Sequence, residues 1–244
     1  MPAASTSISR IAERGRAVPS LLARLLALGL LALGPFAAGA GTAQAMSFTL
    51  EPGEQGRKVV VGRGIIEAGD ARRLRDALPG ADRDEWGNRQ LVLESLGGNV
   101  GEAFAMVEVM EAEKVTTRVR AGKSCASACA VIVFAAGLDR IVEPGGRLGI
   151  HTCYEKGGGA RSSSCNELIA NAAQKHGVPF IATFTLMELT PPGKVRWLDA
   201  ENAACWRLSR DPAPPPGRKP PPNDPSACPP PLAEPATGPG ITRR

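Results

Sequence analysis

The residues of this chain that could do chemistry are a serine and a histidine, 24 positions apart. Ser127 lies in the stretch Lys123-Ser124-Cys125-Ala126-Ser127-Ala128-Cys129, whose small residues mark a predicted strand-to-helix junction. His151 directly follows a short run, residues 147–150, that predicts a strand. A hydroxyl nucleophile at such a junction, followed by an imidazole base after the next strand, has the chain order of a serine hydrolase site.

Residues 1–45 have the pattern of a secretory signal peptide. An apolar run, residues 25–40, precedes an Ala43-Gln44-Ala45 motif, and the basic positions are Arg10, Arg14, Arg16 and Arg24. This order predicts export to the periplasm or secretion. The alternative is an uncleaved anchor, because residues 21–40 approach the roughly 20 residues that span a bilayer. Contact with a membrane is expected only in that case.

Residues 209–244 predict a disordered, Pro-rich tail, because they hold almost no apolar side chain to bury. A PxxP ligand or an envelope spacer is the alternative to a plain extension.

The two ends of the chain account for its formal charge of +5, with four Arg and one Glu in 1–45 and five basic and three acidic residues in 209–244. The middle, residues 46–208, is nearly neutral, which argues against nucleic-acid binding by the folded part.

All six cysteines follow the predicted signal peptide, which fits an oxidising compartment in which disulfides persist. Six cysteines allow 15 complete pairings. We expect one of them, Cys153 with Cys165, because these two bracket a loop rich in Gly and Ser. Zinc is disfavoured, because Cys125 and Cys129 have no second matching pair and no histidine at finger spacing. Neither a metal nor a cofactor is therefore expected.

Residues 46–208 have the size of one domain and alternate predicted strands with predicted helices. Strands are expected at 58–61, 64–66, 90–94, 116–120, 140–142 and 147–150. Helices are expected at 71–78 after the N-cap or first-turn acid Asp70, at 100–113, at 124–136 with Ser124 as N-cap, and at 200–205 with Asp199 as N-cap. This alternation predicts an α/β fold with a mainly parallel sheet and flanking helices. Functional groups should then gather beyond the carboxyl ends of the strands.

Three segments, taken in order, resemble the ClpP/crotonase superfamily, and most closely its secreted branch of ClpP-like periplasmic proteins. Residues 94–98 resemble the strand and Gly-Gly turn of Clp proteases. Ala126-Ser127-Ala128 and the apolar segment that follows resemble their nucleophile helix, and residues 148–151 resemble the strand that ends in their catalytic histidine. The resemblance covers roughly residues 59–208 and implies a spiral of ββα units.

The resemblance implies that Ser127 is the nucleophile, His151 the general base, and the backbone N–H groups of Gly98 and Ala128 the oxyanion hole. The chain would then be a serine peptidase or related hydrolase that acts on an extended peptide or protein, and its copies would form a homo-oligomer. A catalytically inactive envelope module that binds peptides or serves in assembly is the alternative with the same fold. A crotonase-type acyl-CoA enzyme is disfavoured, because CoA is not an expected envelope metabolite.

The third member of the catalytic triad departs from the family pattern. The family's aspartate would fall near Lys194 or Val195, and neither is an acid. Asp199 and Glu188 are the carboxylates that could substitute, although Asp199 has the position of a helix N-cap. A Ser-His pair whose other imidazole nitrogen binds a carbonyl or a water would keep part of the rate.

Overall fold

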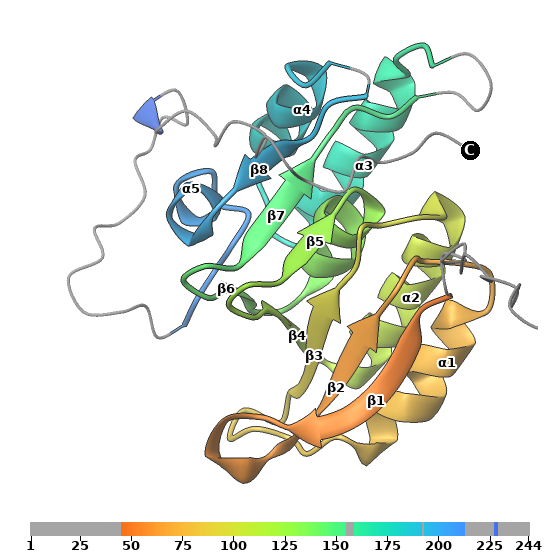
Figure 1. The fold of residues 1–244 in the computed structure, drawn as a ribbon, viewed down its shortest axis with the longest axis vertical. Coiled ribbons are helices and arrows are strands. Elements are labelled where there is room, and N and C mark those ends of the chain that lie inside the picture. The colour runs from red at the N-terminus through yellow and green to blue at the C-terminus, as the bar shows by residue number, and fades with distance from the viewer. Residues whose placement is uncertain (1–44, 155–158, 192, 213–226, 229–244) are drawn as a thin grey trace, which may run out of the picture. The chain divides into compact units, whose positions relative to one another are not determined.

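The computed structural model describes residues 45–154, 159–191, 193–212 and 227–228. The predicted signal peptide lies outside the described residues except for Ala45, and so does most of the predicted Pro-rich tail. The described chain is mixed α/β, with a mostly parallel five-stranded sheet, a three-stranded mixed sheet and flanking helices (Figure 1). In this part of the chain, no helix is long and apolar enough to cross a membrane.

The first sheet has five strands in the order β1-β2-β3-β4-β6. They are β1 (Ser47–Pro52), β2 (Lys58–Arg63), β3 (Arg89–Glu94), β4 (Val115–Val119) and β6 (Arg140–Val142). Only β1 runs antiparallel to its neighbour, and the other three pairings are parallel. Three consecutive residues of β3, Leu91 to Leu93, are fully buried, as expected for a central parallel strand that is covered on both faces.

Two helices, α1 (Asp70–Ala77) and α2 (Val100–Glu113), lie side by side against the first sheet (Figure 1). Asn99 caps α2, because its side chain accepts a hydrogen bond from the Glu102 N–H at 3.0 Å. Asp70 is a buried acid in the first turn of α1, where its carboxylate accepts from the Glu67 N–H and from Arg73. The two helices that the sequence predicts at 71–78 and 100–113, and the position of Asp70 as a first-turn acid, are therefore confirmed.

The second sheet has the order β5-β7-β8, with β5 (Ser124–Ala126) parallel to β7 (Arg147–Ile150) and β7 antiparallel to β8 (Arg196–Leu198). Two helices that pack on each other, α3 (Ser163–Lys175) and α4 (Phe180–Glu188), connect β7 to β8. The last helix, α5 (Ala200–Cys205), begins after Asp199, whose side chain accepts from the Asn202 N–H at 2.8 Å. Asp199 is thus an N-cap, as its position in the sequence predicts.

The two sheets meet where β3 ends. Ser95 donates its N–H to the Ser124 carbonyl at 3.0 Å and accepts from the Ala126 N–H at 2.9 Å. A buried helical segment then follows β5 and packs against both α2 and α3. It consists of a π-helical turn, Cys129–Val133, and a 3₁₀ turn, Phe134–Ala136. The end of β3 and the start of this segment are thereby held next to each other.

Two expected elements are wrong. Residues 124–126 form strand β5 instead of the first turn of a helix, so Ser124 is not an N-cap. These small residues have no apolar periodicity that favours a helix or a strand. They form a strand because β5 pairs with both Ser95 and β7. Residues 64–66 do not form a strand either, since the chain bends at Gly64 (φ 115°) and Ile65 and Ile66 form only isolated bridges.

A buried guanidinium joins distant parts of the described chain. Arg140 is 1 % exposed, and its Nε donates to the Leu208 carbonyl at 2.8 Å. Its Nη1 donates to the carbonyls of Gly137 at 3.1 Å and His176 at 3.0 Å. Burial lowers the pKa of Arg140 from 12.5 to about 10, so it stays charged at neutral pH. β6, the end of α3 and the segment after α5 thus share one cationic donor.

We predict that Arg140→Met lowers the free energy of unfolding by about 3 kcal/mol, because three buried carbonyls lose their donor. Urea denaturation of the purified protein measures this loss. Arg75→Met, on the exposed face of α1, is the matched control and should change stability by less than about 0.5 kcal/mol. Equal losses in the two variants would show that the buried guanidinium contributes nothing specific.

Candidate active site

Ser127 lies in a one-residue turn between β5 and the buried helical segment. Its backbone φ is 55°, in the left-handed region that side-chain-bearing residues seldom adopt. The Ser127 N–H donates to the Gly149 carbonyl at 2.8 Å, and its carbonyl accepts from the N–H groups of Ala130 and Val131. The side chain is partly exposed, although its neighbours Ala126 and Ala128 are buried. Sharp strand-to-helix turns of this kind present a nucleophile above a sheet.

A disulfide closes this turn. Cys125 in β5 and Cys129 at the start of the helical segment are bonded to each other, and Ser127 is the central residue of the five-residue loop. Both cysteines are fully buried. The disulfide therefore fixes the angle between strand and helix from the protein interior and leaves the serine hydroxyl on the outside.

The Gly97-Gly98 turn lies directly against Ser127. A Cβ at Gly97 would lie 2.6 Å from the Ser127 Cβ and 3.0 Å from the Ala128 nitrogen, so this contact excludes any side chain. The Gly97 carbonyl accepts from the Ile66 N–H at 2.9 Å. Because the Gly98 N–H belongs to the same trans peptide, it points away from Ile66, toward the side where Ser95 pairs with β5.

The Ala128 N–H is the first donor of the helical segment. The Ser127 carbonyl accepts from Ala130 and Val131, and no described acceptor lies within hydrogen-bond distance of the Ala128 N–H. The first N–H groups of a helix have no partner inside the helix. Ala128 therefore offers a free donor next to Gly97, on the residue that follows the serine.

His151 follows strand β7, the parallel neighbour of β5. The register pairs Ala126 with Gly149, so Ser127 and His151 each lie just beyond the carboxyl end of adjacent strands. The His151 ring is largely buried, and Tyr154 lies beside it with 5.8 Å between the ring centroids. Tyr154 is half-exposed, which places an aromatic side chain at the mouth of the same site.

The His151 ring is held by a backbone carbonyl. Its Nδ1 lies 2.7 Å from the Thr152 carbonyl oxygen, which can only accept, so Nδ1 carries the proton and Nε2 is left with a free lone pair. Burial lowers the pKa of His151 from 6.5, and the Thr152 carbonyl opposes this shift. The imidazole is therefore neutral at physiological pH, with Nε2 as its basic atom.

The described residues do not bring a serine hydroxyl, an imidazole and a carboxylate into one hydrogen-bonded triad. In the described part of the chain, no hydrogen bond links the Ser127 hydroxyl to His151. No carboxylate of the described residues bonds to the His151 ring. Asp199 caps α5, and Glu188 binds Asn166 and Arg161. His176 lies at the C-terminal end of α3, 3.5 Å from Glu111, and has a structural position.

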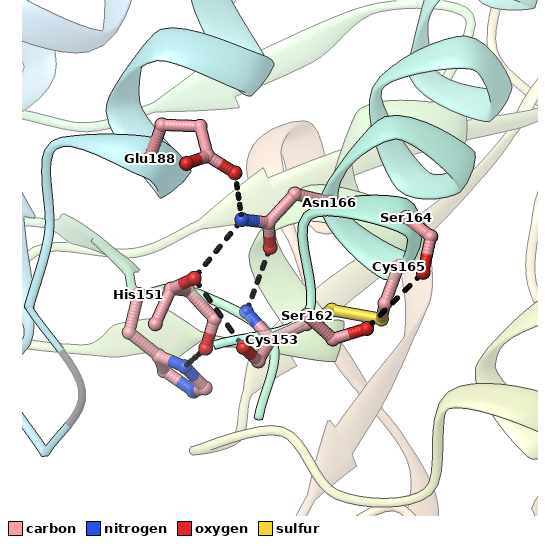
Figure 2. The surroundings of a disulfide bond; sticks show 8 residues. His151, Cys153, Ser162, Ser164, Cys165, Asn166 and Glu188 are labelled. Atoms are coloured by element: carbon pink, nitrogen blue, oxygen red, sulfur yellow. Dashed lines mark hydrogen bonds between the residues drawn. A yellow bond between two sulfur atoms is a disulfide. The ribbon is translucent and has the colours of Figure 1, made fainter. Parts of the chain in front are cut away.

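One residue close to His151 carries no signal in the sequence. Asn166, in α3, is fully buried and bonds to Thr152, Cys153 and Glu188, as Figure 2 shows for its labelled partners. The Cys153–Cys165 disulfide, which the spacing of the cysteines predicts, lies beside it. Asn166 lies in a polar Ser-Ser-Cys-Asn-Glu segment, where no periodicity distinguishes a buried amide from a surface one.

Two cavities, of about 660 and 680 Å³, lie away from this site. One is lined by α2 and α3, and the other by the loops at the opposite end of the first sheet, and neither is lined by Ser127 or His151. Ser127 and His151 are themselves only partly exposed.

The sequence matches no model of a known protein family, and it matches no curated protein.

We predict that Gly97→Ala lowers the free energy of unfolding by about 3 kcal/mol. The left-handed backbone (φ 92°) accounts for about 1 kcal/mol of this loss, and overlap with Ser127 accounts for about 2 kcal/mol. Gly87→Ala is the matched control, because its φ is 81° and no atom lies within 4 Å of the added Cβ. If urea denaturation gives the same loss for both variants, the close contact with Ser127 is absent.

Proposed function

We propose that this chain is an exported serine hydrolase, a peptidase with the ββα spiral of the ClpP/crotonase superfamily. Ser127 is its nucleophile, His151 its general base, and the N–H groups of Gly98 and Ala128 are its oxyanion hole. The observation that carries the proposal is the left-handed backbone of Ser127, between a parallel strand and a buried helical segment, with a neutral histidine after the adjacent strand.

Such a backbone conformation costs of order 1 kcal/mol or more and persists only where the surroundings enforce it. Here the Cys125–Cys129 disulfide, the hydrogen bond to Gly149 and the contact with Gly97 enforce it together. A serine that served only for close packing would need none of these constraints. Their convergence on one hydroxyl supports a role in chemistry.

In the acylation step, Nε2 of His151 takes the proton from the Ser127 hydroxyl while Oγ attacks the substrate carbonyl. The carbonyl oxygen becomes an oxyanion that accepts from the Gly98 and Ala128 N–H groups, and each such donor is typically worth about 3 to 4 kcal/mol. The imidazolium then gives its proton to the leaving amine, and an acyl-serine remains. Water, deprotonated by the same Nε2, attacks the ester, and the imidazolium returns this proton to the leaving Ser127 Oγ, which releases the acid and the free serine.

Exposed apolar side chains beside the site favour a peptide substrate. Leu96 and Tyr154 are both exposed and lie close to the site in sequence. An extended peptide laid along the Gly97-Gly98 segment would contact these apolar side chains and the backbone donors at once.

A catalytically inactive peptide-binding module is the second candidate. Two observations favour it, namely that Ser127 and His151 are not directly hydrogen bonded and that no carboxylate in the described ranges bonds to the His151 ring. Catalytic hydrogen bonds are, however, often loose in a site without substrate and tighten only in the complex. Reactivity of the serine toward an electrophile separates the two candidates.

We predict that a fluorophosphonate probe labels the purified mature protein at Ser127, with loss of fluoride and formation of a serine phosphonate. Ser127→Ala should abolish labelling, and His151→Ala should slow it by about 10²- to 10⁴-fold. Ser124→Ala is the matched control and should label like the unmodified chain. Absence of labelling in the native protein, or labelling that survives Ser127→Ala, would favour the inactive module.

The pH dependence of labelling tests the role of His151. The base works only when neutral, and its pKa lies below 6.5 because the ring is buried. Reactivity should therefore persist as the pH falls through 6.5 and should decline only at lower pH. His176→Asn should leave this profile unchanged. A midpoint at or above pH 6.5 would contradict the assignment of the buried imidazole as the base.

A further inference from the structure

The amide of Asn166 is a buried polar group that the reaction steps above do not use. Asn166 is 0 % exposed in the first turns of α3, and its side chain makes three hydrogen bonds. Its Nδ2 donates to the Thr152 Oγ1 at 2.9 Å and to Glu188 Oε1 at 2.7 Å, and its Oδ1 accepts from the Cys153 N–H at 2.7 Å. Figure 2 shows the amide between Glu188 and Cys153.

One of these bonds controls the group that holds His151. The Cys153 N–H and the Thr152 carbonyl belong to the same planar trans peptide, so they point in opposite directions. Asn166 binds this peptide by its N–H, and His151 binds it by its carbonyl, both at 2.7 Å. The position of the Asn166 amide therefore sets the direction in which the carbonyl faces the imidazole.

Glu188 completes the chain of hydrogen bonds. Its other carboxylate oxygen accepts from Arg161 at 3.0 Å, and the bond from Asn166 is the main cause that lowers the pKa of Glu188. Glu188 is therefore ionised at neutral pH. Hydrogen bonds in series polarise one another, so negative charge at Glu188 strengthens the Thr152 carbonyl as an acceptor for the His151 Nδ1–H.

A merely structural role does not account for this arrangement. The loop after His151 is already tied to α3 by the Cys153–Cys165 disulfide and by the Ser162 N–H, which donates to the Cys153 carbonyl at 3.0 Å. These tethers remain when the Asn166 amide is removed. What the amide adds is the orientation of one peptide plane.

We propose that Asn166, anchored by Glu188, is a positioning residue with the role that a triad acid has, since no acid of the described residues bonds to His151. It orients the Thr152–Cys153 peptide, whose carbonyl fixes His151 as the Nδ1–H tautomer and leaves Nε2 as the base. This inference rests on the proposed function, because the tautomer of His151 matters for catalysis only if His151 is the base.

The test is nitrogen NMR of the histidine ring, since the chain has only two histidines and His176→Asn leaves His151 alone in the spectrum. In this background, His151 should be a single Nδ1–H tautomer above its pKa. Asn166→Ala should give a mixture of both tautomers and slow fluorophosphonate labelling by about 10²-fold, as expected for a displaced base. Asn202→Ala, at another buried asparagine, is the matched control and should change neither quantity.

A paired exchange keeps the test independent of any failure to fold. Asn166→Asp alone sets a second carboxylate against Glu188 and should disturb the tautomer as Asn166→Ala does. Combined with Glu188→Gln, it restores a complete set of partners, because the new carboxylate accepts from the Cys153 N–H, from the Thr152 hydroxyl and from the new amide at position 188. The double variant should recover the Nδ1–H tautomer and most of the labelling.

The outcomes separate this inference from the proposed function. If the fluorophosphonate labels the protein but Asn166→Ala leaves the His151 tautomer unchanged, the role of Asn166 is overturned and the proposed hydrolase function stands. Recovery in the double variant supports the role of Asn166 even when Asn166→Ala does not fold, and failure to recover the tautomer in a folded double variant overturns it. The third outcome is that the His151 tautomer depends on Asn166 but no fluorophosphonate labels the protein. This result would support the positioning role of Asn166 and refute the proposed hydrolase function.

Discussion

The site depends on one constraint, the left-handed turn that carries Ser127. Strand β5 enters this turn while paired on one side to Ser95 and on the other to β7, so the direction of the chain before the serine is fixed. The buried helical segment fixes the direction after it, and the Cys125–Cys129 disulfide joins the two. The close contact of Gly97 then brings the Gly-Gly turn against the serine. Each of these constraints is common in proteins. Acting together, they hold the Ser127 hydroxyl in a single position.

The disulfides connect the geometry of the site to the compartment. One of them encloses Ser127, a second holds the loop after His151 to α3, and the third joins Cys205 to Cys228. Disulfides persist where the environment is oxidising and are rare where thiols are kept reduced. Two of the three lie next to the candidate catalytic residues, so oxidation would complete the site as well as stabilise the fold.

The sequence predicts the elements whose side chains carry a pattern, and it fails where none exists. Apolar runs between glycines and caps identify β3, α2 and β7, and Asp199 is recognisable as an N-cap. Strand β5 is missed because Ser-Cys-Ala has no period and is strand only through its neighbours. The role of Asn166 is missed for a similar reason, since its partners Thr152 and Glu188 are 14 and 22 residues away. Contacts of that range depend on the packing of α3 and α4, which no local pattern encodes.

Among the described residues no carboxylate bonds to the His151 ring, which has a definite consequence for the proposed chemistry. A carbonyl fixes the tautomer as well as a carboxylate does, but it does not neutralise the imidazolium that forms when Ser127 gives up its proton. Burial of the ring makes this cation more costly still, as the lowered pKa of His151 shows. The charge of Glu188, transmitted through Asn166 and one peptide, offsets only part of that cost. In the proposed hydrolase, acyl transfer would therefore be slow and its rate would rest mainly on the oxyanion donors, because their hydrogen bonds do not depend on an acid at His151.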